Sequence, residues 1–144
     1  MVWPRYHQLD AVRRLLEATR KDGVGQRFLI QHSAGSGKSN SITWLAYQLV
    51  GLLDGTQPLL DSVIVVTDRV NLDGQIRDNI IAFKRLQNLV EHADSADALR
   101  QHLESGKKII ITITATTYLD IITATTYLDF FMIQLAFITH FLRA

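Results

Sequence analysis

Apolar residues recur along this chain with two periods, one typical of amphipathic helices and one typical of buried strands. Three- and four-residue steps predict helices over residues 6–20, 38–53 and 70–83, and a shorter helix from the cap Ser95 to Glu104. Continuous apolar runs predict strands over residues 27–31, 62–67 and 108–114, with a short strand near 89–91. Because strands alternate with helices, the pattern predicts an α/β fold with a parallel sheet flanked by helices.

The composition changes sharply near residue 112. From residue 113 to 144 only Asp120, Asp129 and Arg143 are charged, and the segment 113–120 is repeated without change as 122–129. We therefore predict a partial α/β lobe over 1–112 and an aberrant, repeat-containing apolar tail over 113–144. A tandem duplication or a frame-shifted terminus is our preferred interpretation of the tail. The alternative is a genuine buried helix after an unusual linker.

Composition and charge restrict the function classes. The chain has 144 residues, enough for one core, and a net charge of +1, so nucleic acid binding would need a local basic patch. It has no cysteine, which excludes disulfides and cysteine-ligated zinc and favours the cytoplasm. The apolar run 130–142 would span roughly 20 Å as a helix, short of the ~30 Å bilayer core, so no membrane association is expected.

A glycine-rich loop is the strongest candidate site. Residues 32–39 read His-Ser-Ala-Gly-Ser-Gly-Lys-Ser and lie between the apolar run 28–30 and a predicted helix. Gly35 and Gly37, on either side of Ser36, let the backbone curl so that successive N–H groups point inward and form an anion cradle. The N-terminus of the following helix adds partial positive charge.

Two side chains complete the predicted phosphate site. The Lys38 ammonium can reach the β- and γ-phosphates of ATP, and the Ser39 hydroxyl can coordinate Mg²⁺. His32 occupies the position of the first glycine of the strict motif, so the loop matches a looser form of the motif. The alternative is a chance glycine–serine turn before a helix.

Two further positions allow more than one interpretation. The carboxamide of Gln8 could match the Hoogsteen edge of adenine, with Tyr6 stacked on the base, although a solvated glutamine at a helix start is the more frequent case. Thr67, Asp68 and Arg69 follow a predicted strand and could contact a nucleic-acid backbone. Equally, Asp68 could simply cap the next helix.

Four segments, taken together, resemble the motor region of the R (restriction) subunit of type I restriction–modification enzymes. They are residues 4–8, 31–39, 65–72 and 105–112. The resemblance implies a partial RecA-like P-loop NTPase lobe of the superfamily 2 helicase type. It also implies ATP-driven DNA translocation and cleavage by the intact subunit, in a complex with methylation and specificity subunits.

The resemblance also implies roles for individual residues. It places Gln8 in the adenine-sensing motif, Gly35, Gly37, Lys38 and Ser39 at the phosphate and Mg²⁺ site, and residues 67–69 in a motif that tends to face DNA.

One departure from the family is large. The family's Asp-Glu motif, which holds Mg²⁺ and positions the attacking water, has no counterpart, since no Asp-Glu pair occurs in this sequence. Asp120 and Asp129 each lie in a repeat copy without an adjacent glutamate. We therefore expect weak nucleotide binding and negligible hydrolysis by this chain alone. A non-catalytic nucleotide-binding fragment, or another P-loop enzyme such as a kinase, is the alternative.

Overall fold

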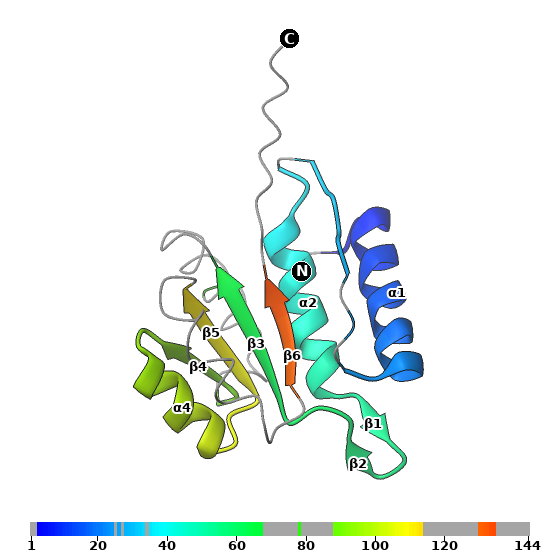
Figure 1. The fold of residues 1–144 in the computed structure, drawn as a ribbon. Coiled ribbons are helices and arrows are strands. Elements are labelled where there is room, and N and C mark those ends of the chain that lie inside the picture. Colours follow the sequence, from blue (N-terminus) through cyan, green and yellow to red (C-terminus); the bar gives the residue numbers. More distant parts are fainter. Residues whose placement is uncertain are drawn as a thin grey trace.

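A parallel sheet with helices on both faces organises the chain (Figure 1). The computed structural model describes residues 3–24, 26, 28–33, 35–67, 78, 88–113 and 130–134. The sheet has the order β4-β5-β3-β6, and every neighbouring pair is parallel. Its strands are β3 (Ser62–Thr67), β4 (Val90–Ala93), β5 (Ile109–Ile113) and β6 (Phe130–Gln134). This confirms the predicted fold class, an α/β partial RecA-like lobe.

Alternating side chains of the central strands divide the core into two layers. Val63 and Val65 of β3 pack with Leu45 and Leu49 on one face, together with other residues of α1 (Tyr6–Asp22) and α2 (Lys38–Val50). On the other face, Ile64 packs with residues of α4 (Ala96–Glu104). Because successive strand residues point to opposite faces, a strand covered by helices on both sides must be apolar throughout.

The described helices begin and end where the sequence predicts, within a few residues. Ser95 accepts a hydrogen bond from the Ala98 N–H (3.2 Å) and so caps α4. Gly23 ends α1 with a φ of 73°, a conformation that glycine adopts without strain. After α2, residues 53–58 form a small hairpin in which β1 (Leu53–Asp54) pairs antiparallel with β2 (Gln57–Pro58).

The prediction of a strand over residues 27–31 is wrong for residues 28–31, the part of this range that the structure describes. Residues 28–31 carry no strand and pair with no other strand among the described parts of the chain. Phe28, Leu29 and Ile30 are 44%, 81% and 46% exposed. The segment finds no place beside the central strand, because β5 pairs with one edge of β3 and β6 with the other. In Figure 1 the segment instead runs beside α1 and α2 towards the start of α2.

Part of the predicted tail also contributes to the sheet. Phe130–Gln134 forms β6, which pairs with Ser62–Val66 in parallel register, so a helix does not begin at residue 130. The predicted helix 70–83 and the repeat lie outside the described residues, apart from residues 78 and 113. The predicted boundary at residue 112 stays a prediction. Within the described ranges, no helix is long and apolar enough to cross a membrane.

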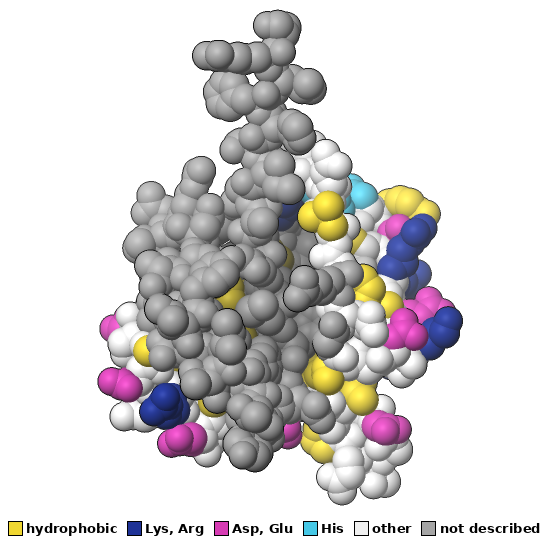
Figure 2. Space-filling view, viewed as in Figure 1, with side chains coloured by type: hydrophobic (Ala, Val, Ile, Leu, Met, Phe, Trp, Pro, Cys, Tyr) yellow, Lys and Arg dark blue, Asp and Glu magenta, His cyan; other side chains and the backbone are white. Residues whose placement is uncertain are grey.

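Charged side chains of both signs are interspersed on the outer surfaces of α1 and α4 (Figure 2). On α1, the side chains of Asp10 and Arg14 form an ion pair one helical turn apart, at 3.0 Å. An exposed pair of this kind contributes less than about 1 kcal/mol to stability. These surfaces are therefore typical solvated helix faces.

Candidate functional site

The predicted phosphate loop leads directly into α2, at the end of the sheet where the strands finish (Figure 1). Gly35 and Gly37 have φ values of 71° and 81°, which side chains rarely adopt. Gly37 has a second constraint, because a Cβ there would collide with Nε2 of Gln8. Gly37 is therefore fixed both by its backbone conformation and by the close approach of α1.

Gln8 joins the first turn of α1 to the loop. Its Nε2 donates to the carbonyl oxygens of Ser36 (3.2 Å) and Gly37 (2.8 Å), and its Oε1 accepts from the Arg5 N–H (2.8 Å). The side chain is only 3% exposed. Both amide hydrogens are thus committed to the loop, so in this structure Gln8 shapes the phosphate loop. The adenine contact of Gln8 stays a prediction.

The Lys38 side chain folds over the loop that precedes it. Its Nζ donates to the carbonyl oxygens of Ser33 (2.8 Å) and His32 (3.4 Å). The first turn of α2 contains no acidic residue, so nothing on that turn neutralises the positive end of the helix. The ammonium and the helix N-terminus together favour an anion.

Two serine hydroxyls suit a phosphate and its metal ion. Ser36 is buried, and its Oγ has no hydrogen-bond partner among the described residues, so it can donate to an incoming oxygen. Ser39 lies in the first turn of α2, where its carbonyl oxygen accepts from Thr43 Oγ1 (2.9 Å). The described residues contain no group of three or more His, Asp or Glu side chains that could hold a metal without phosphate.

Two histidines contact each other at this site, and only His32, which lies in the loop itself, could be placed there from the sequence. The ring of His7 lies edge-on to the ring of His32, with centroids 5.1 Å apart, and His7 Nε2 lies 3.1 Å from the Ser36 carbonyl oxygen. Burial, His7 and the Lys38 ammonium together lower the pKa of His32 below its ordinary 6.5. His7 directly precedes Gln8 on the helix turn that meets the loop, which is the one sequence feature that could have suggested its role.

The structure brings the predicted site residue Gln8 into contact with the loop at Ser36 and Gly37. The predicted DNA-facing residues are placed only in part. Thr67 is the last residue of β3 and is fully buried, while Asp68 and Arg69 lie outside the described residues. Their contact with nucleic acid therefore stays a prediction.

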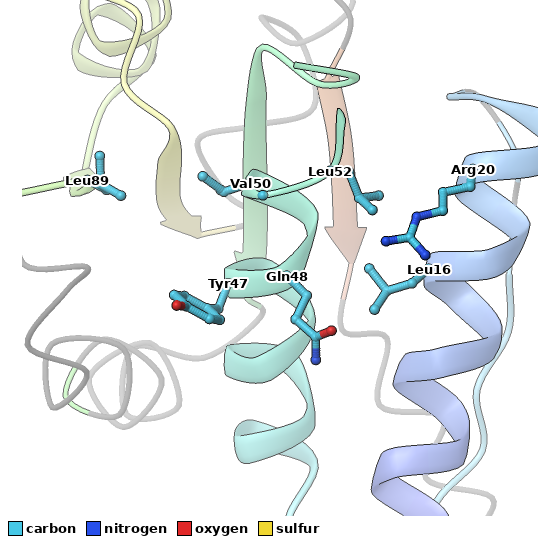
Figure 3. A pocket seen from close by; sticks show the side chains of 8 residues that line it. Leu16, Arg20, Tyr47, Gln48, Val50, Leu52 and Leu89 are labelled. Carbon is cyan, nitrogen blue, oxygen red and sulfur yellow. The ribbon is translucent and has the colours of Figure 1, made fainter. Parts of the chain in front are cut away.

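A hollow of about 460 Å³ lies at the other end of α2 (Figure 3). It is lined by Leu16, Arg20, Tyr47, Gln48, Val50, Gly51, Leu52 and Leu89. Since α2 starts at the phosphate loop and rises roughly 1.5 Å per residue, the hollow is more than about 10 Å from the loop. It is therefore a separate feature of the structure.

Comparison with known proteins gives two matches. The sequence model of the SWI2/SNF2 ATPase family matches residues 7–124. The type I restriction enzyme HindI endonuclease subunit of Haemophilus influenzae is 33% identical over 107 residues, which are 71% of this chain and 10% of that protein. The chain thus spans about a tenth of the length of that relative. No solved structure matches. The two matches confirm the resemblance to the type I R-subunit motor region.

Proposed function

Since this chain belongs to the SWI2/SNF2 ATPase family, we propose that it is the ATP-binding part of a type I restriction motor. It binds Mg-ATP through Gly35, Ser36, Gly37, Lys38 and Ser39. The observation that carries the proposal is the Lys38 ammonium, which lies over a two-glycine loop at a helix N-terminus that has no acidic residue in its first turn.

Binding of ATP exchanges one set of Lys38 contacts for another. Lys38 Nζ releases the Ser33 and His32 carbonyls and donates to the phosphate oxygens instead. Both kinds of bond have the charged ammonium as donor, but a phosphate oxygen also carries negative charge, so the bond to phosphate is stronger than the bond to a neutral carbonyl oxygen. Ser36 Oγ gains the acceptor that the described residues do not supply.

The hydroxyl of Ser39, in the first turn of α2, would hold Mg²⁺ beside the phosphates. A Mg²⁺ ion held there would supply positive charge that offsets the charge of the phosphates. Hydrolysis also needs groups on the other side of the γ-phosphate. Because the sequence has no Asp-Glu pair, this chain alone hydrolyses ATP negligibly.

The proposal of DNA and partner subunits rests on the similarity of this chain to a type I restriction enzyme subunit. In the intact enzyme, ATP hydrolysis drives DNA translocation and cleavage, and methylation and specificity subunits complete the complex in the cytoplasm. We assign Thr67, Asp68 and Arg69 to a segment that faces the DNA backbone, an assignment supported by the position of Thr67 at the carboxyl end of β3. Since Thr67 itself is fully buried, the contact would be made by the two residues that follow it.

Titration of the purified chain with a fluorescent ATP analogue in Mg²⁺ tests this function. We expect saturable binding, and at least about tenfold weaker binding by Lys38→Ala, since hydrogen bonds to charged groups contribute roughly 1.5–3 kcal/mol. Lys108→Ala is the matched control, because Lys108 Nζ also donates to a backbone carbonyl, that of Asp61 (3.2 Å). Equal binding by both variants would refute the proposed site. DNA-stimulated hydrolysis that Lys38→Ala abolishes would refute the claim of inactivity.

A further inference from the structure

His7 contacts both ends of the phosphate loop, and no residue role assigned so far accounts for it. Its ring packs against that of His32, the first residue of the loop, and its Nε2 lies 3.1 Å from the carbonyl oxygen of Ser36 near the loop's end. A carbonyl oxygen only accepts, so Nε2 carries the hydrogen and donates. One imidazole thus ties residues 32 and 36 to the first turn of α1.

The orientation of the Ser36 carbonyl controls the direction of a backbone N–H. In a trans peptide unit the C=O and the following N–H point in opposite directions, and none of the described peptide bonds is cis. His7 and Gln8 both hold the Ser36 carbonyl towards α1. The N–H of Gly37 therefore points away from α1.

The next peptide unit is held in the same way. The Gly37 carbonyl accepts from Gln8 Nε2 (2.8 Å), and also from the N–H groups of Asn40 (3.1 Å) and Ser41 (3.2 Å) in α2. The N–H of Lys38 therefore points out of the N-terminus of α2, where a helix attracts anions. The two N–H groups are aimed before any ligand arrives.

Gln8 alone does not account for the orientation at Ser36. Its single amide nitrogen serves two carbonyls, and the bond to Ser36 (3.2 Å) is longer than the bond to Gly37 (2.8 Å). His7 gives the Ser36 carbonyl its second donor, while the ring of His32 limits the position of the His7 ring. The carbonyl of His32 meanwhile holds Lys38 Nζ at 3.4 Å.

We propose that His7 is a positioning residue of the phosphate site, which fixes the Gly37 N–H for a nucleoside triphosphate by holding the Ser36 carbonyl and packing on His32. The proposal rests on the proposed function. It gives this site a fixed anion cradle that depends on α1, a helix outside the glycine-rich motif.

The test compares His7→Gln, which places an amide nitrogen near the position of Nε2, with His7→Asn, whose amide is too short to reach Ser36. Fluorescent ATP titration should show near wild-type affinity for His7→Gln and roughly three- to tenfold weaker binding for His7→Asn, the effect of one hydrogen bond. His102→Asn is the matched control, since His102 Nε2 makes the same kind of contact (3.2 Å) with the His92 carbonyl, away from the loop.

A second measurement needs no nucleotide. In ¹H–¹⁵N spectra of the free protein, His7→Asn should move the Gly37 amide signal and speed its hydrogen exchange, while His7→Gln and His102→Asn leave it close to wild type. Unchanged Gly37 signals, or equal ATP affinity of the two His7 variants, would overturn the proposal. If wild-type protein binds no nucleotide, the proposed function fails, and the amide measurement alone decides whether His7 orients the loop.

Discussion

Two apolar segments of this molecule have similar composition, but one is a buried strand and the other is exposed and forms no strand. Residues 63–66 of β3 are almost completely buried, with parallel partners on both edges and helices on both faces. Residues 28–30 are also apolar, yet they are 44–81% exposed and form no strand. Apolar composition therefore predicts that a segment can be a buried strand, whereas pairing decides whether it is one.

The two segments also differ in how they are held in place. β3 carries the core between α2 and α4, and its register fixes its neighbours. Residues 28–30 run into a loop held by side chains of α1 and by Lys38. The phosphate loop is thus held by hydrogen bonds from α1 and from Lys38, and among the described residues no strand supports the segment before it.

Removing apolar volume from each segment gives the largest expected difference. Ile111→Ala in β5 removes a fully buried side chain and should lower the free energy of unfolding by about 2–5 kcal/mol. Leu29→Ala, in the exposed segment, should change it by less than about 0.5 kcal/mol. Urea denaturation followed by circular dichroism measures both. A large loss from Leu29→Ala would mean that residues 28–30 are packed in solution.

Alanine at the two loop glycines separates backbone strain from collision. Gly35→Ala meets open space, so it should cost only the roughly 1 kcal/mol of an unfavourable positive φ. Gly37→Ala has the same strain and also displaces Gln8, so it should cost about 1–2 kcal/mol more and weaken ATP binding further. Thermal unfolding and ATP titration of the two variants make the comparison. Equal effects would mean that Gln8 does not hold the loop.

A buried hydroxyl at the start of β3 should have a smaller effect. Ser62 Oγ donates to the Lys107 carbonyl (2.7 Å) just before β5, so Ser62→Ala should cost about 1 kcal/mol. The control is Ser33→Ala in the exposed loop, where the carbonyl that accepts from Lys38 is retained. Its stability should stay at wild-type level in the same urea titration.

The dependence of stability on pH should give the smallest effects. A hydrogen bond from Lys107 lowers the pKa of Glu91 below 4.5, although burial opposes it. As pH falls, the Glu91 carboxylate is therefore protonated in the unfolded chain before it is protonated in the folded chain. The stabilisation is present above pH 4.5 and is lost as pH falls through the pKa of the folded state. Since both side chains are about one-third exposed, we expect less than about 0.5 kcal/mol.

His32 gives the matching measurement in the loop. Its pKa is lowered by burial and by the charges of His7 and Lys38, so the unfolded chain binds the proton more readily than the folded chain. The free energy of unfolding should therefore fall as pH drops below 6.5. His32→Asn should flatten this slope, and Glu91→Gln should flatten the slope below pH 4.5, as measured by urea denaturation from pH 3 to 8. Unchanged slopes would contradict the assigned environments.

Local patterns predicted most of the described fold. Ser62–Thr67 formed the predicted strand because its partners and its helical cover are all supplied by this chain. The failure at residues 28–31 and the pairing of Phe130–Gln134 with β3 both concern which strands become neighbours. Neighbours are chosen by contacts distant in sequence, which local periodicity does not encode.

The candidate site was predictable to a similar extent. Residues 35–39 follow from a motif in which each position has a chemical role, so they could be named from the sequence. The bonds of Gln8 and His7 to Ser36 join residues 28 and 29 positions apart, and no local rule predicts that contact. Thr67 was named from its place at the end of a predicted strand, but its complete burial depends on the packed sheet.

The carboxamide of Gln8 makes the start of α1 and the phosphate loop one cooperative unit. A single planar group accepts from Arg5 and donates to Ser36 and Gly37, so fraying of the first helical turn breaks the loop's hydrogen bonds in the same event. Local opening in proteins proceeds in such units. A fusion partner or affinity tag that disturbs the helix start just ahead of Arg5 would therefore weaken the hydrogen bonds of the phosphate loop. The effect would appear at Ser36 and Gly37, far along the sequence from the point of attachment.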